Sequence, residues 1–205
     1  MNINQPIKHL LRSGWLLLLT GCLGGTTPPA QFYLLEPVNL PTNSPMVAVN
    51  KSLIALGPIR IPHYLDRPQM VTASAKNVYQ VNELHRWAEP LDGNISRVLQ
   101  QNLAVLIPAE VVLNNASNLA KQARYRLSVN ILEFHVTPQS QASLTAHWQI
   151  TEGETLHTSR QVAYQLPAST TDYRVMVEAL NECLNRMSKD IADELSALGK
   201  SSAVR

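Results

Sequence analysis

Two stretches of the chain carry apolar residues at the spacing of an amphipathic helix. The first follows Pro90, a residue suited to the first helical position, and it ends at Ile107-Pro108. Its apolar stripe comprises Leu91, Ile95, Val98, Leu99, Asn102/Leu103 and Leu106. The second stretch runs from about Asp172 to Leu198. Its predicted buried face comprises Met176, Leu180, Cys183/Leu184, Met187, Ile191, Leu195 and Leu198. Gly199 is expected to end this helix and leave residues 200–205 as a frayed tail.

Between the two helices, polarity alternates with the two-residue period of β-strands. In residues 125–136 the apolar side chains fall on one face until Phe134 breaks the alternation, which predicts a bulge near Leu132–Glu133. Residues 143–150 alternate again, with Leu144, Ala146, Trp148 and Ile150 on the inward face. A turn at Glu152-Gly153 leads to a third such segment, residues 160–166. Together they predict an antiparallel meander.

Shorter strands are predicted before the meander. They comprise residues 32–35, 52–62 and 109–115, with two or three more in residues 69–90 that bend at 74–77 and 82–84. The order of strands, helix, strands and helix predicts an α+β fold. It would be a mixed, mostly antiparallel sheet with two amphipathic helices packed on it, formed by a single domain over residues 32–199.

The N-terminus has the order of charges and apolar residues that a secretory signal requires. Lys8 and Arg12 precede the apolar run 15–19, which is too short to cross a bilayer. The residues that follow, Leu19, Thr20, Gly21 and Cys22, resemble the lipobox of bacterial lipoproteins. Residues 1–21 are therefore predicted to be a lipoprotein signal peptide. Cys22 is the predicted site of acylation, by palmitate or a similar chain.

Two further interpretations of Cys22 are weaker than lipid attachment. A core cysteine would not be followed by the flexible run 23–31, which offers nothing to pack around it. A disulfide to Cys183 would clip a flexible arm onto a helix. Residues 22–31 are instead expected to form a flexible tether, and Cys183 a buried thiol. Leu23, rather than aspartate, follows the acylated residue, and in similar lipoproteins of Gram-negative bacteria that implies delivery to the outer membrane.

Charge argues against one class of partner. Lys8 and Arg12 leave with the signal peptide, so the mature chain has fifteen basic and fifteen acidic residues. No basic stripe remains to bind phosphates, and nucleic acid is not an expected partner. With 45% hydrophobic residues, the chain has enough apolar material for a core.

The usual signatures of catalysis and metal binding are absent from the sequence. His135, His147 and His157 fall on or beside successive predicted strands, but their spacing matches no metal-binding motif. Glu89 and Asp92 form the most suggestive carboxylate pair, yet a position at the start of a helix explains them as cap and dipole partners. We therefore expect a non-enzymatic protein without a cofactor or metal.

Two loops combine aromatic residues with arginine, as contact surfaces often do. They are IPHYLDRP and HRWAEPL, and their candidate partner contacts are Tyr64, Arg67, Arg86, Trp87 and Glu89. An equally weighted alternative is that Tyr64 and Trp87 plug the edge of the core, with an arginine stacked on them.

The same segments carry a resemblance to a family. The lipobox, the run from Pro62 through Pro68, the WAEPL run at 87–91 and the closing amphipathic helix resemble the ABC-type transport auxiliary lipoproteins, the PqiC/YmbA-like group. The resemblance implies a non-catalytic lipoprotein on the periplasmic face of the outer membrane. It also implies an MCE-domain partner in an inner-membrane ABC-type lipid transport system. Homo-oligomeric ring assembly is a further expectation, taken from some members of the family.

Two rival functions belong to other classes. One is a structural lipoprotein that helps an outer-membrane machine to assemble without touching lipid. The other, less favoured, is a lipid-tethered periplasmic hydrolase, for which the candidates are Glu89, Asp92 and the strand histidines. Proton transfer would require these groups to lie in contact or to be joined by one water molecule.

Overall fold

The computed structural model describes residues 28–38, 52–113 and 118–203. Within these residues, one sheet of eight strands and three helices form an α+β fold. The elements are β1 (Gln31–Tyr33), β2 (Ser52–Leu56), β3 (Gln69–Ala75), β4 (Val78–Trp87), α2 (Leu91–Leu106), β5 (Ala109–Leu113), α3 (Leu119–Gln122), β6 (Tyr125–Val136), β7 (Gln141–Glu152), β8 (Thr155–Pro167) and α4 (Tyr173–Ala203). The predicted signal peptide, Cys22 and most of the tether lie outside the described residues.

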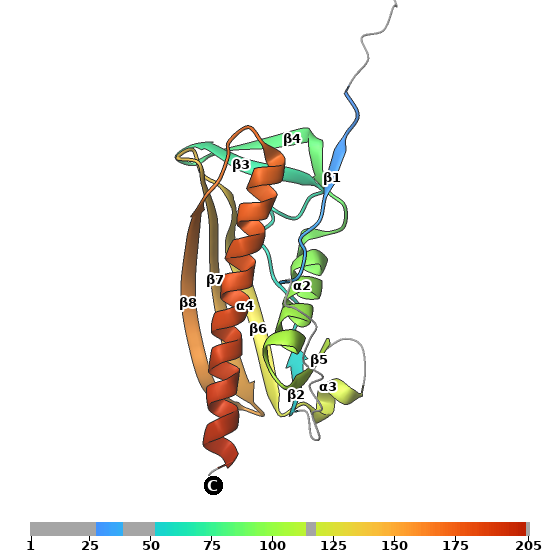
Figure 1. The fold of residues 1–205 in the computed structure, drawn as a ribbon, viewed down its shortest axis with the longest axis vertical. Helices are drawn as coiled ribbons and strands as arrows, with labels where there is room; N and C mark the ends of the chain where they lie inside the picture. The colour runs from blue at the N-terminus through green and yellow to red at the C-terminus, as the bar shows by residue number, and fades with distance from the viewer. Residues whose placement is uncertain (1–27, 39–51, 114–117, 204–205) are drawn as a thin grey trace, which may run out of the picture.

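Strand β6 organises the sheet. One edge of β6 pairs with β7, and β8 follows β7, so the three strands form the predicted antiparallel meander. The other edge of β6 is shared. At one end it pairs in parallel with β2, and at the other Val136 pairs with Thr72 of β3. The sheet then continues from β2 to β5, and from β3 through β4 to β1. Figure 1 shows β3 and β4 crossing one end of the molecule, above the long strands β6–β8.

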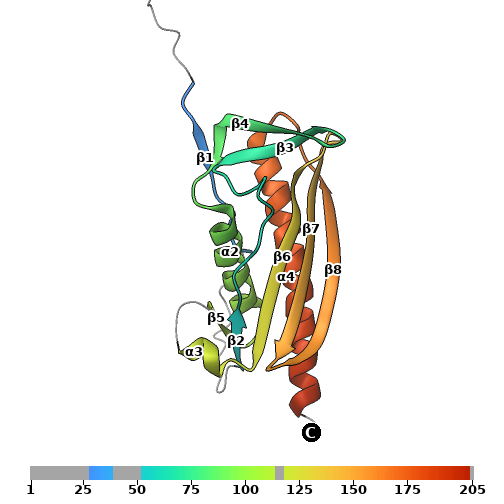
Figure 2. The ribbon, with the colours of Figure 1, turned by 180° about the vertical axis from the view of Figure 1, so that it is seen from behind.

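Helix α4 lies along the length of the β6–β8 layer, and α2 packs beside it (Figures 1 and 2). The core fills the space between the helices and the sheet. Its largest fully buried side chains include Trp148, Phe134, Leu127, Ile131 and Leu144. The predicted inward residues of β7 are all buried, because a strand with one covered face directs alternate side chains into the core.

Several predicted elements are confirmed. Helix α2 covers Leu91–Leu106, within the predicted limits. The register of β6 shifts between Ile131 and Glu133, so the predicted bulge is present. The turn after β7 contains Gly153 with φ 56°, a backbone conformation that glycine adopts without strain.

Other predictions are wrong in detail. Helix α4 does not end at Gly199 but continues to Ala203. No bend occurs at residues 82–84, because β4 runs unbroken through them. The predicted strand 52–62 stops at Leu56, and beyond it Arg60 makes an isolated bridge to Asn130. Helix α3 was not predicted.

A short segment after β1, residues 34–38 (the strap), is held against α2 and α4. Leu35 is fully buried, and its carbonyl oxygen accepts a hydrogen bond from Arg97 at 3.0 Å. The backbone N–H of Glu36 donates to Asn181 Oδ1, and that of Val38 donates to Asn102 Oδ1, both at 2.8 Å. Side-chain amides of both helices therefore bind the backbone of the strap, which has no strand partner of its own.

Across the described ranges, none of the helices combines the length and the apolar character needed to cross a membrane.

Candidate functional site

The two loops singled out in the sequence lie next to each other. The N–H of Trp87, at the end of β4, donates a hydrogen bond to the carbonyl oxygen of Pro68 at 2.7 Å. The next residue along, Gln69, is paired with Arg86 in the β3–β4 register. The antiparallel pairing of β3 with β4 therefore brings the first loop beside the second.

Trp87 belongs to the core. Its side chain is 5% exposed, and its ring centroid lies 6.2 Å from that of Phe134. The neighbouring Arg86 is half-buried, and its Nε atom is buried without a hydrogen-bond partner. Of the two interpretations of these aromatic residues, the core plug describes Trp87.

Glu89 is tied to the helix that follows it. Its Oε1 accepts a hydrogen bond from Arg97 Nε at 3.1 Å, and Arg97 also donates to Asn94 and to the strap. Pro90 occupies the cap position of α2, and no side chain caps the helix start, so the expected capping role of Glu89 is wrong. Asp92 does lie in the first turn, where the helix dipole favours an acid.

Tyr64 joins an aromatic cluster with Tyr79 and His135. The ring centroids of Tyr64 and Tyr79 are 5.0 Å apart, and Tyr64 Oη lies 3.5 Å from His135 Nδ1. Burial raises the pKa of Tyr64, and the nearby Tyr79 and Glu133 add to this effect. Burial lowers the pKa of His135, against a smaller opposing effect of Glu133. Both groups are therefore held neutral at pH 7.

The hairpin of β3 and β4 exposes apolar side chains that lie outside the predicted contact residues. Val78, Tyr79 and Val81 are 51%, 45% and 40% exposed. Tyr79 and Val81 lie on the same face of β4, whereas Val78 lies on the opposite face. We call Tyr79, Val81, half-buried Tyr64 and exposed Arg67 the hairpin surface. The signal for it was the run of apolar residues directly after the turn at 76–77, and the first four residues of β4 are all exposed.

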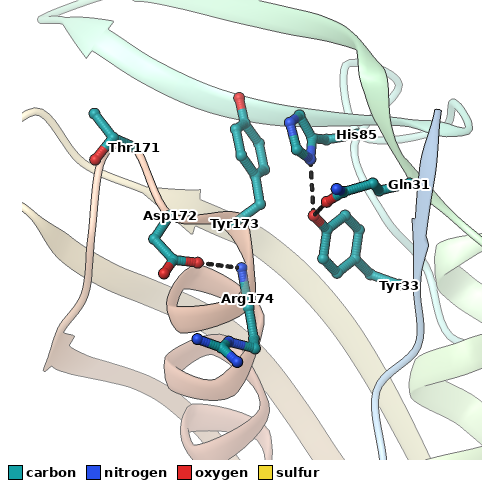
Figure 3. Close-up of a pocket in the computed structure, with 7 residues that line it drawn as sticks. All are labelled: Gln31, Tyr33, His85, Thr171, Asp172, Tyr173 and Arg174. Carbon is teal, nitrogen blue, oxygen red and sulfur yellow. Dashed lines mark hydrogen bonds between the residues drawn. The ribbon is translucent and has the colours of Figure 1, made fainter. Parts of the chain in front are cut away.

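A pocket of about 720 Å³ lies where β1, β4 and the start of α4 meet (Figure 3). We call it the Tyr173 pocket. Its lining residues are Gln31, Tyr33, His85, Thr171, Asp172, Tyr173 and Arg174. The rings of His85 and Tyr173 stack in parallel at 3.7 Å, and Tyr33 Oη lies 2.8 Å from His85 Nδ1. None of these residues belongs to the set predicted from the sequence.

The strand histidines do not form one site. His135 is in the aromatic cluster, whereas His147 hydrogen-bonds Ser159 and His157 pairs with Glu152. Within the part of the chain that the structure describes, no group of three or more His, Cys, Asp or Glu residues has a metal-binding arrangement. Cys183 is fully buried, as predicted, and burial raises its pKa to about 11.

Comparison with solved structures supports the fold. A crystal structure of a Xanthomonas campestris protein covers 85% of this chain with a TM-score of 0.67, at 13% identity and over its whole length. A second crystal structure, of an uncharacterized protein, covers 82% of this chain and 99% of its own, with a TM-score of 0.69 and 21% identity. At these identities the likeness concerns the fold alone.

Comparison of sequences defines the family. The chain is 25% identical over 183 residues to the intermembrane transport lipoprotein PqiC of Escherichia coli strain K12, covering 89% of this chain and 94% of that one. The PqiC of Shigella flexneri matches to the same extent. A family model described as the ABC-type transport auxiliary lipoprotein component matches residues 33–192. The resemblance found in the loops and the closing helix is thereby confirmed, and this chain belongs to the ABC-type transport auxiliary lipoprotein family.

Proposed function

We propose that this protein is an outer-membrane lipoprotein of the periplasm that serves as a non-catalytic auxiliary component of an ABC/MCE-type intermembrane lipid transport system. The acyl chains on Cys22 hold the domain at the membrane, and the domain docks to an MCE-domain partner anchored in the inner membrane. Lipid passes along the assembly without chemical change. The observation that carries this proposal is the family match across residues 33–192, together with a PqiC relative aligned over 89% of the chain.

The proposed docking site is the hairpin surface. Apolar side chains that are exposed to water carry a free-energy cost, and a partner that covers them recovers that free energy. Tyr79 and Tyr64 supply aromatic area, and Arg67 supplies a rim charge, which is a composition enriched in binding surfaces. Trp87 and Glu89, which were also predicted contacts, are instead held in the core and by Arg97 of α2.

Docking is tested by changing the hairpin surface without changing the core. We expect the double variant Tyr79→Ser and Val81→Ser to weaken binding to the periplasmic part of the MCE-domain partner by about tenfold or more. The free energy of unfolding should fall by no more than about 1–2 kcal/mol, because Val81 is exposed and Tyr79 loses only its ring contacts with Tyr64 and His135. Circular dichroism should confirm that the variant is folded. Leu156→Ser in β8 is the matched control, because this residue is 54% exposed but distant in the sheet order. Equal binding by both variants would place docking elsewhere.

Anchoring is tested at Cys22. We expect Cys22→Ser to block acylation and cleavage, so that the chain no longer fractionates with the outer membrane as the processed lipoprotein. Cys183→Ser is the control, because that thiol is buried and takes no part in attachment. Normal processing and unchanged sedimentation of Cys22→Ser would overturn the anchor.

A further inference from the structure

The Tyr173 pocket is built by segments far apart in the sequence. The parallel pairing of β1 with β4 places Gln31 opposite His85, and the start of α4 supplies the remaining wall. Tyr33 lies across the pocket from the residues of α4 in Figure 3. At about 720 Å³, the space is in the range of a small-molecule site.

One wall of the pocket is aromatic and held in place. His85 and Tyr173 are stacked with an interplanar angle of 4°, and the centroid of Tyr33 lies 6.4 Å from that of Tyr173. The Tyr33 hydroxyl donates to Gln31 Oε1 at 2.7 Å and lies within hydrogen-bond distance of His85 Nδ1. Because the rings hold one another in place, a ligand that contacts the outer face of this stack would lose little free energy in ordering them.

The wall formed by α4 carries two opposite charges that do not neutralise each other. Asp172 Oδ1 accepts hydrogen bonds from the backbone N–H groups of Arg174 and Val175. Among the described residues, neither Asp172 Oδ2 nor the Arg174 guanidinium has a hydrogen bond or an ion pair with another side chain. The Asp172 carboxylate also contributes to a raised pKa of Tyr33, after burial, so its negative charge acts inside the pocket.

This combination selects the chemistry of the ligand. An ammonium group is attracted both by the face of a tyrosine ring and by a carboxylate, whereas a phosphate is bound by a guanidinium. A simple anion would be repelled by Asp172 and a simple cation by Arg174. A zwitterion that carries an ammonium and a phosphate a few bonds apart satisfies both charges at once.

We propose that the Tyr173 pocket binds the zwitterionic headgroup of a phospholipid in the membrane that carries the lipid anchor. The ammonium lies against Tyr173 and Asp172, and the phosphate lies on Arg174. The short tether supports the membrane as the source. Gln31 is nine residues after Cys22, and nine residues span at most about 30 Å. This step rests on the proposed anchor, and the headgroup then fixes how the domain is oriented on its own membrane.

The chemistry of the pocket is tested first with a soluble probe that does not depend on the anchor. We expect the full mature chain, in non-ionic detergent, to bind glycerophosphoethanolamine in an NMR titration. Asp172→Asn keeps the helix cap but removes the charge, and Arg174→Gln removes the guanidinium; each should weaken binding by about fivefold or more. Arg186→Gln, at an exposed arginine further along α4, is the control and should bind as wild type does.

The source is tested in nanodiscs with phosphatidylethanolamine that carries a photoreactive diazirine in its headgroup. We expect cross-links to map to β1 and the first turn of α4, and to fall with Asp172→Asn but not with Arg186→Gln. If the soluble probe binds but these cross-links do not form, the ligand is a free zwitterion, and the proposal that the pocket binds a membrane phospholipid is wrong. No effect of Asp172→Asn or Arg174→Gln in either assay would overturn the site itself. Binding to the MCE-domain partner, measured in parallel, reports separately on the proposed function.

Discussion

The rings of Trp87 and Phe134 pack with their centroids 6.2 Å apart, and this contact joins the end of β4 to β6 inside the core. Trp87→Ala removes the whole indole from a site that is 5% exposed. We expect the free energy of unfolding to fall by about 3–5 kcal/mol, measured by urea unfolding with circular dichroism. Arg67→Ala, at an exposed residue of the neighbouring loop, should change it by less than about 0.5 kcal/mol. A stable Trp87→Ala that fails to bind a partner would instead make Trp87 a contact residue.

Arg97 connects α2 to the strap, so its loss should loosen residues 34–38 before it unfolds the domain. Arg97→Gln removes the bonds to Glu89 and to the carbonyl oxygen of Leu35. We expect a loss of about 1–3 kcal/mol in unfolding free energy and faster hydrogen exchange at the amides of Glu36 and Val38. Glu89→Gln removes only a half-exposed ion pair and should cost less than about 1 kcal/mol. Equal exchange in the two variants would mean that Arg97 does not hold the strap.

His135 should make stability depend on pH in the mildly acidic range. Its pKa is lowered in the folded protein by burial, so below the unfolded value of about 6.5 the unfolded chain binds the extra proton more readily. Stability should therefore be greatest above that pH and fall as the pH drops toward the folded pKa. We expect His135→Gln to flatten this part of the profile in urea unfolding between pH 7.5 and 5. His63→Gln, at an exposed loop histidine, is the control. If the unfolding free energy of the His135→Gln variant changes with pH as steeply as that of wild type, the pH dependence comes from other groups.

The thiol of Cys183 should be unreactive in the folded protein. Its thiol is fully buried with a pKa raised to about 11, chiefly by burial, so little thiolate exists at pH 8. We expect the rate of maleimide labelling of Cys183 to be at least about 100-fold lower in buffer than in 8 M urea. The rate is measured by mass spectrometry. Rapid native labelling would show that α4 separates readily from β7 and β8.

The elements with a strong local pattern were predictable. The apolar stripe of α2 and the alternation in β6 and β7 each follow from one buried face, and Phe134 revealed the bulge because it broke that alternation. The predicted end of α4 at Gly199 is wrong because Gly199 does not adopt the positive φ of a C-terminal turn, and the helix continues through it. The sequence pattern does not predict helix α3, because this helix is four residues long and buries only Ala120.

The long-range pairings carried no local signal. The parallel pairing of β1 with β4 unites Tyr33 with His85, which are 52 residues apart, and the Tyr173 pocket follows from that register. The loops at Tyr64 and Trp87 were found from their composition, but composition does not say which aromatic side chain faces water. Burial of Trp87 and exposure of Tyr79 both depend on where β4 lies against β3 and β6.

The strap has a mechanical consequence. Any pull on the chain ahead of Gln31 reaches the molecule through β1, which has three paired residues, and then through Leu35, Glu36 and Val38. The load then passes into the two helices through Arg97, Asn102 and Asn181. The long strands β6–β8 are loaded later. Tension along the tether would thus be borne first by the pairing of β1 with β4, which lines the Tyr173 pocket, and then by the contacts of the strap with α2 and α4.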